Sequence, residues 1–100
     1  MAYQVVWSST AIEDVEAIAN YISRDSSAYA AAVVQKILDV TRNLNNFPFS
    51  GRIVLELKED NIREKFAYNY RIIYRIENDT ITIASVIHGK RILDVENDLL

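Results

Sequence analysis

Cationic side chains that could contact phosphate are concentrated in the second half of this 100-residue chain. Residues 52–91 carry eight Lys/Arg against six Asp/Glu, whereas the rest carries three against eight. Such cations could hold phosphate, or bind acidic side chains of a partner. The candidates are Arg52, Arg63, Arg71, Arg75, Lys90 and Arg91. The net charge of −3 argues against general nucleic-acid binding, because phosphate contacts dominate that affinity.

Two pairs of these cations have the even spacing that places side chains on one face of a strand. Arg71 and Arg75 form one pair, and Arg63 and Lys65 form the other on the preceding strand. If the strands pair in register, a basic sheet face results. The alternative is that cross-strand carboxylates neutralise the cations. The carboxylates available for this are Glu56, Glu59, Asp60, Glu64 and Glu77.

His88 is the only histidine, and a histidine titrates near neutral pH unless it is perturbed. It could transfer protons, but no acid–base partner is identifiable in the sequence. We therefore favour a structural role, with a hydrogen bond to the backbone where its strand ends. A lone histidine in a chain without cysteine predicts no metal site. With only two glycines and no phosphate-binding loop pattern, the sequence also predicts no cofactor.

Three further residues are singled out around the only proline. Phe47 and Phe49 flank Pro48, and at least one of them is expected to be exposed as part of a partner-binding patch. Gly51 follows closely, and we expect it to adopt a positive φ before the next strand.

The elements that must position these residues follow from hydrophobic periodicity. Alternation predicts strands at 3–7, 53–57, 62–67, 70–76 and 80–87. Helical stripes predict a helix that begins with a capping box at Thr10 and Glu13, and a second helix capped by Ser26 or Ser27. A short helix is also predicted within 91–100.

The predicted fold class is α+β, one domain over residues 1–100 with the order β-α-α-β-β-β-β. The short link between the helices predicts a hairpin packed on one face of a mostly antiparallel sheet. The first strand has no sequence neighbour to pair with, so it is expected at an edge. The strand at 80–87 is apolar on both faces, so it is expected in the interior.

Four motifs in this order resemble the RelE/ParE toxin superfamily. They are FPFSGR at 47–52, IRE at 62–64, YRIIYRI at 70–76 and VIHGKR at 86–91. The resemblance runs from about residue 3 to residue 93. It implies a growth-inhibiting toxin of a bacterial type II toxin–antitoxin module, of the kind linked to plasmid stabilization, which a cognate antitoxin neutralises.

The resemblance implies one of two activities. ParE-like members inhibit DNA gyrase by binding it, and RelE-like members are ribosome-dependent endoribonucleases that cut mRNA. The RelE-like enzymes use several Lys/Arg and a Tyr or His near the C-terminus. Residues 92–100 contain no Tyr, His or Lys, and they carry three acidic residues that would repel RNA. We therefore favour the ParE-like branch, in which no residue is catalytic. The alternative mRNA interferase would use Arg63, Arg71, His88 and Arg91. A degenerate member that only binds its antitoxin is a third reading.

The expected partners are the antitoxin and either gyrase or the ribosome with its mRNA. We expect the antitoxin to wrap the helix hairpin and sheet with a helix and an extended segment, adding a strand at an edge. Both a homodimer and a heterotetramer with antitoxin fit this expectation. No segment approaches the ~18 apolar residues of a membrane span, and residues 1–7 lack signal-peptide features. We therefore expect a cytoplasmic protein without membrane contact.

Overall fold

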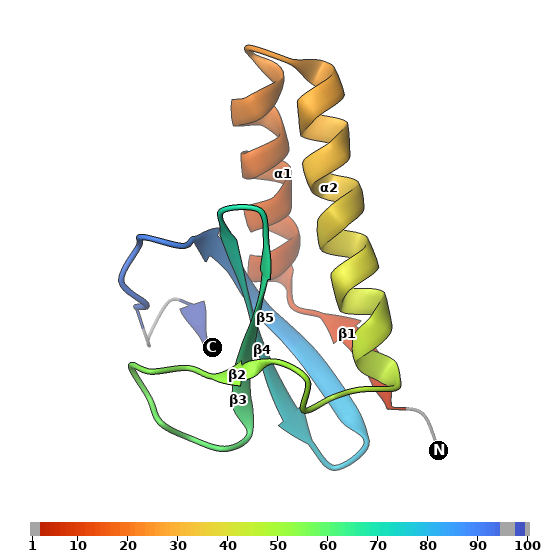
Figure 1. The fold of residues 1–100 in the computed structure, drawn as a ribbon, viewed down its shortest axis with the longest axis vertical. Helices are drawn as coiled ribbons and strands as arrows, with labels where there is room; N and C mark the ends of the chain where they lie inside the picture. Colours follow the sequence, from red (N-terminus) through yellow and green to blue (C-terminus); the bar gives the residue numbers. More distant parts are fainter. Residues whose placement is uncertain (1–2, 95–97, 100) are drawn as a thin grey trace.

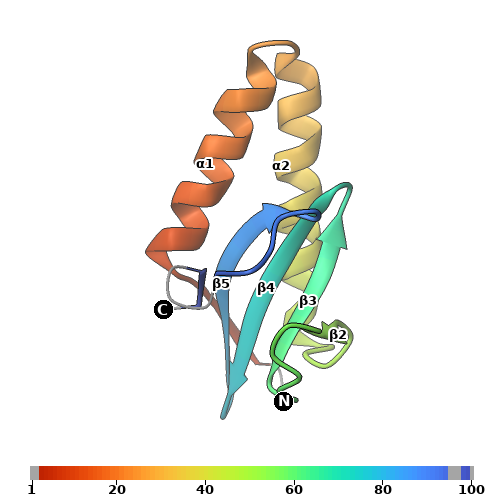
Figure 2. The same cartoon turned by 90° about the vertical axis from the view of Figure 1, so that its left-hand side faces the viewer.

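A computed structural model describes residues 3–94 and 98–99 (Figure 1). A hairpin of two long helices packs against one face of a five-stranded sheet and extends beyond the end of it (Figure 2). The predicted α+β architecture is confirmed. In chain order the elements are β1 (Gln4–Trp7), α1 (Ser9–Ser23), α2 (Ser27–Arg42), a 3-10 turn (Asn43–Asn45), β2 (Arg52–Ile53), β3 (Ile62–Ala67), β4 (Tyr70–Glu77) and β5 (Thr80–His88).

The strand order in the sheet is β1-β5-β4-β3-β2. β1 runs parallel to β5, with Gln4 opposite Thr80, and the other neighbours are antiparallel. β1 therefore lies at an edge and β5 in the interior, as the sequence predicted. The long stretch of chain between β1 and β5 permits this parallel pairing, because parallel strands need a crossover connection.

The N-terminus of α1 differs from the prediction, because Ser8 and not Thr10 caps the helix. Ser8 Oγ accepts a hydrogen bond from Ala11 N at 3.0 Å and donates one to Ala84 O of β5 at 2.9 Å. The hydrogen bond to β5 favours Ser8 as the cap, and the spacing of residues in the sequence does not indicate this long-range contact. At the start of α2, Ser26 accepts from Tyr29 N at 3.0 Å, one of the two predicted caps.

The second strand is much shorter than predicted. The sequence predicts a strand over 53–57, whereas β2 contains only Arg52 and Ile53. Beyond it the chain turns, and Lys58 N donates to Val54 O at 2.9 Å, with Lys58 at φ 56°. This turn buries Val54 fully and leaves Leu55 exposed. Burial of one side chain thus overrides the alternating pattern.

Gly51 has no positive φ, so the reason we gave for this glycine was wrong. Steric crowding explains the glycine instead, because a Cβ at this position would lie 2.5 Å from the hydroxyl of Tyr74 and 2.6 Å from Glu64 O. The residues with positive φ in the hairpin turns are Tyr68 before β4 and Asn78 before β5.

Two apolar clusters lie on the two faces of the sheet. The larger one fills the space between the sheet and the helix hairpin, around Val33, Ile37 and Tyr74. The smaller one, on the opposite face, contains Leu93 and Leu99 from the C-terminal segment. The helix predicted within 91–100 includes 95–97 and 100, which lie outside the described residues. Neither described helix is long and apolar enough to cross a membrane.

Candidate functional site

Arg71 is buried in a network of carboxylates on the sheet face opposite the helices. Its Nε donates to Glu64 Oε1 at 2.6 Å, and its Nη1 and Nη2 donate to the two oxygens of Glu56 at 2.9 Å each. Nη1 also donates to Arg91 O at 3.2 Å. Arg71 is only 5% exposed. Its guanidinium is therefore occupied by the protein and does not present its donors to an external phosphate.

The same network holds Arg52 at the sheet edge. Arg52 Nε lies 2.6 Å from Glu64 Oε2, so the buried Glu64 carboxylate pairs with two arginines. The side chain of Arg52 stays 58% exposed and lies over the ring of Phe66, 5.0 Å from its centre. Arg52 thus covers the buried pair and keeps part of its surface towards solvent.

Arg63 anchors the loop that precedes β2. Its Nη1 donates to the backbone oxygens of Phe49 and Gly51 at 3.3 and 3.1 Å, and its Nη2 contacts Asp60 Oδ1 at 2.8 Å. The guanidinium also lies over the ring of Phe49 at 5.0 Å. Phe49 is 46% exposed and Phe47 is 66% exposed, so both predicted aromatics lie at the surface.

The single basic sheet face, one of the two arrangements that the sequence left open, does not form. In the β3–β4 register Arg63 lies opposite Tyr74 and Lys65 opposite Ile72, on the face that carries the helices. Arg71 belongs to the other face, where Glu64 and Glu56 neutralise it. The cross-strand pairing that we set against the basic face is what the structure shows.

The two remaining arginines of the predicted set, Arg75 and Arg91, form ion pairs close to the C-terminal segment. Arg75 lies 2.7 Å from Glu77 and donates through Nη1 to Leu99 O at 3.2 Å. Arg91 Nη2 lies 3.0 Å from Asp98 Oδ1. These contacts tie the chain after β5 to the sheet face that carries Arg71.

His88 ends β5 with an exposed ring. Its Nδ1 accepts from Lys90 N at 3.2 Å, which is the backbone contact expected at this corner, and its ring meets Tyr70 edge to face at 5.7 Å. Within the described residues Lys90 makes no ion pair, unlike the predicted arginines. The described residues also contain no cluster of His, Cys, Asp or Glu that could hold a metal ion.

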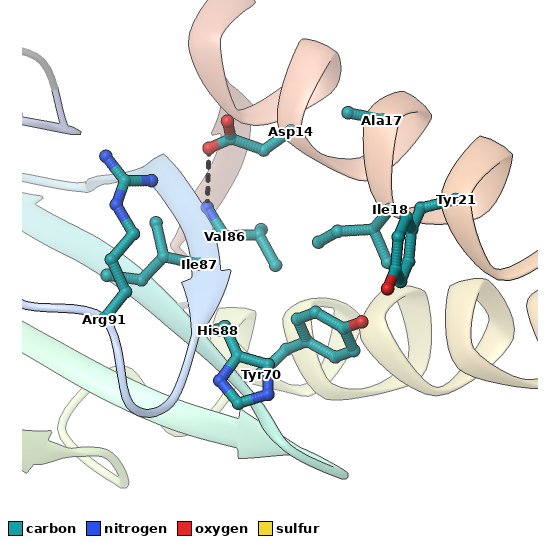
Figure 3. A pocket seen from close by; sticks show the side chains of 9 residues that line it. All are labelled: Asp14, Ala17, Ile18, Tyr21, Tyr70, Val86, Ile87, His88 and Arg91. Carbon is teal, nitrogen blue, oxygen red and sulfur yellow. Dashed lines mark hydrogen bonds between the residues drawn. The ribbon is translucent and has the colours of Figure 1, made fainter.

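Sequence reasoning missed a groove of about 450 Å³ beside His88 (Figure 3). Its polar lining includes Asp14 and Tyr21 of α1, Tyr70 of β4 and Arg91. Asp14 Oδ2 accepts from Val86 N at 2.9 Å and so joins α1 to β5. A signal existed in the sequence, because Tyr21 lies outside the apolar stripe of its helix.

Several solved structures of toxins and toxin–antitoxin complexes have a similar fold. A chain from the chromosomal ParDE toxin–antitoxin system of P. aeruginosa matches with a TM-score of 0.73 and 17% identity, over 89% of this chain and 98% of that one. The toxin–antitoxin complex RelBE2 of Mycobacterium tuberculosis matches with a TM-score of 0.60 and 22% identity, over 88% of this chain and 99% of the other. An Arg-to-Ala double mutant of E. coli toxin RelE in the free state matches with a TM-score of 0.65 and 13% identity, over 90% of this chain and 86% of the other. A comparison with curated proteins returned no match.

The helix hairpin packed on a mixed sheet is therefore the fold of RelE/ParE-like toxins. A family model described as the ParE toxin of the type II toxin–antitoxin system parDE matches residues 5–93. The chain belongs to this family. The match confirms the resemblance that the four sequence motifs indicated.

Proposed function

We propose that this toxin inhibits DNA gyrase by binding it, and that it does not cleave RNA. The observation that carries the proposal is the state of Arg71, which would be a central cation of a ribonuclease site in the alternative reading. It is buried and bonded to Glu56 and Glu64. A cation that is fully paired in the resting protein is a poor stabiliser of new charge on a phosphate.

The family match and the ParDE neighbour support gyrase as the target. The experiment induces the chain without an antitoxin in bacteria and follows DNA breaks and protein synthesis in parallel. We expect DNA damage signalling and gyrase-linked breaks while translation continues. Purified gyrase should lose supercoiling activity when the toxin is added. Early translation arrest with codon-phased mRNA cuts would overturn the proposal, and so would gyrase that keeps its full activity.

The second candidate is an mRNA interferase, which the RelE neighbours and the surface next to His88 favour. There, a depression of about 400 Å³ brings Lys90 and His88 beside the rings of Phe66 and Tyr68. Cations among aromatic rings are suited to unpaired bases and phosphate. The double substitution His88→Ala with Lys90→Ala separates the candidates. It should abolish toxicity if the chain cuts mRNA at this surface and leave gyrase inhibition unchanged otherwise. A chain that never inhibits growth would be the degenerate member.

We also propose a cognate antitoxin as partner in the bacterial cytoplasm, since two of the neighbours are described as a toxin–antitoxin system and a toxin–antitoxin complex. An apolar groove of about 300 Å³ lies next to the edge strand β1, lined by Trp7, Ile12, Val15, Glu16 and Leu38. It fits the expected antitoxin helix, with an added strand along the β1 edge. A homodimer and a heterotetramer with antitoxin are both compatible with this surface.

The antitoxin surface is tested with Ile12→Arg, because Ile12 is 49% exposed in this groove. The substitution should release toxicity in cells that also express the antitoxin encoded beside the toxin. The matched control is Ile92→Arg, which places the same charge at an apolar residue that is 81% exposed and outside the groove. Neutralisation that survives Ile12→Arg would contradict this placement.

A further inference from the structure

The groove in Figure 3 adjoins a second depression of about 250 Å³, with which it shares lining residues. The two depressions share Tyr21, Tyr70 and His88, so they form one surface. We call it the tyrosine groove and define it by Asp14, Tyr21, Asp25, Tyr29 and Tyr70. Its lining comes from α1, the start of α2, the start of β4 and the end of β5.

Three tyrosines supply its aromatic surface. Tyr21 is 68% exposed and Tyr29 is 47% exposed. Burial raises the pKa of the Tyr70 phenol, and Tyr29 and Tyr21 lie near enough to raise it further. Tyr21 and Tyr70 line both depressions, and Tyr29 lines the second one. Neutral phenols offer electron-rich ring faces and oxygen acceptors, and both attract a cation.

A carboxylate stands in each depression of the tyrosine groove. Asp14 lines the first depression and Asp25 lines the second. Among the described residues, neither forms an ion pair. Burial is the main cause of the raised pKa of Asp14, and the hydrogen bond from Val86 N and the charge of Arg91 offset it only in part.

Two arginines of the chain itself lie close by. Arg91 lines the first depression, but its guanidinium pairs with Asp98 at 3.0 Å. Arg24 lies over the ring of Tyr21, 6.0 Å from its centre. The contact with Tyr21 shows that a ring of this groove already receives a guanidinium, and Asp14 and Asp25 add negative charge beyond it.

We propose that the tyrosine groove is a docking site for an arginine side chain of a protein partner. A planar guanidinium can stack on the tyrosine rings while its edge donates to a carboxylate, which a compact ammonium does less well. A nucleotide fits worse, because its phosphate would face Asp14 and Asp25. The inference does not depend on whether gyrase is the target of this toxin.

The test is an NMR titration of the ¹⁵N-labelled full chain with N-acetyl-arginine N-methylamide. We expect saturable shifts of the amides of residues 20–30, 68–70 and 86–89. The citrulline analogue keeps the shape of arginine but lacks the charge, and it should cause much smaller shifts. Equal shifts with citrulline, stronger shifts with adenosine monophosphate, or shifts elsewhere on the chain would each overturn the proposal.

Variants locate the site. Asp25→Asn should weaken arginine binding about fivefold, the effect of one lost exposed ion pair. The matched control is Asp79→Asn in the β4–β5 turn, which should leave binding unchanged. Asp14→Asn keeps an acceptor for Val86 N, so the fold should persist while arginine binding weakens. If both groove variants bind arginine like the wild type in an unchanged amide spectrum, the proposal is wrong.

Discussion

Arg71 and Glu56 are joined by two parallel hydrogen bonds, with each guanidinium Nη 2.9 Å from a different carboxylate oxygen. Glu56 lies in the turn after β2 and also accepts from Leu93 N at 3.4 Å. One carboxylate thus links a sheet strand, a turn and the C-terminal segment. This arrangement has measurable consequences for stability.

The first prediction concerns acid stability. The hydrogen bonds from Arg71 lower the pKa of Glu56 from 4.5 to about 2. A lowered folded-state pKa means that the pair stabilises the fold fully above pH 4.5 and loses its effect as pH falls towards 2. Glu56→Gln should cost about 1–2 kcal/mol at pH 7, because the pair is partly exposed to solvent.

The measurement is urea unfolding between pH 7 and pH 2. The cost of Glu56→Gln should shrink steadily below pH 4.5 and approach zero near pH 2. A cost that stays constant across this range would show that the charge of Glu56 does not stabilise the fold.

The second prediction concerns the buried cation itself. Arg71→Met leaves Glu64 buried with only the partly exposed Arg52 to pair with it. The substitution should lower the free energy of unfolding by about 3–5 kcal/mol, the range for breaking a buried pair. Arg42→Met is the control, because Arg42 is 69% exposed in its pair with Asp39 and should cost less than about 0.5 kcal/mol. Similar costs for the two variants would refute the structural role of Arg71.

The third prediction concerns the close approach at Gly51. Its amide donates to the Tyr74 hydroxyl at 3.0 Å, and a Cβ would collide with that hydroxyl and with Glu64 O. Gly51→Ala should therefore cost about 2–3 kcal/mol in thermal or urea unfolding. Gly89→Ala should cost clearly less, since its Cβ would meet Asn69 O at 3.0 Å. The reverse order would contradict the packing described here.

The fourth prediction concerns the cap of α1. Ser8→Ala removes both the bond to Ala11 N and the bond to Ala84 O, and should destabilise the protein by about 1–2 kcal/mol. Thr10→Ala, which the sequence pattern alone would rank as the damaging change, should be nearly neutral. Equal losses in a thermal melt would restore Thr10 as the cap.

Much of the fold could be predicted from local sequence. Turn residues and alternation gave the order of the elements, and the isolation of β1 gave its edge position. The cap at Ser8 and the short β2 could not be predicted this way. A bond to Ala84 decides the first, and burial of Val54 decides the second. The bond joins residues that are 76 positions apart, and Val54 is buried in a cluster with side chains of β4 and β5, among them Ile73 and Ala84.

The candidate site shows the same division. The sequence by itself determined the family, through four motifs in order, and it supplied both the arginines and the acids that could neutralise them. Only the tertiary structure decided which of these side chains meet. Side chains alternate along a strand, so the two-residue turn at Tyr68 and Asn69 sets the register that places Glu64 beside Arg71 and turns Arg63 to the opposite face.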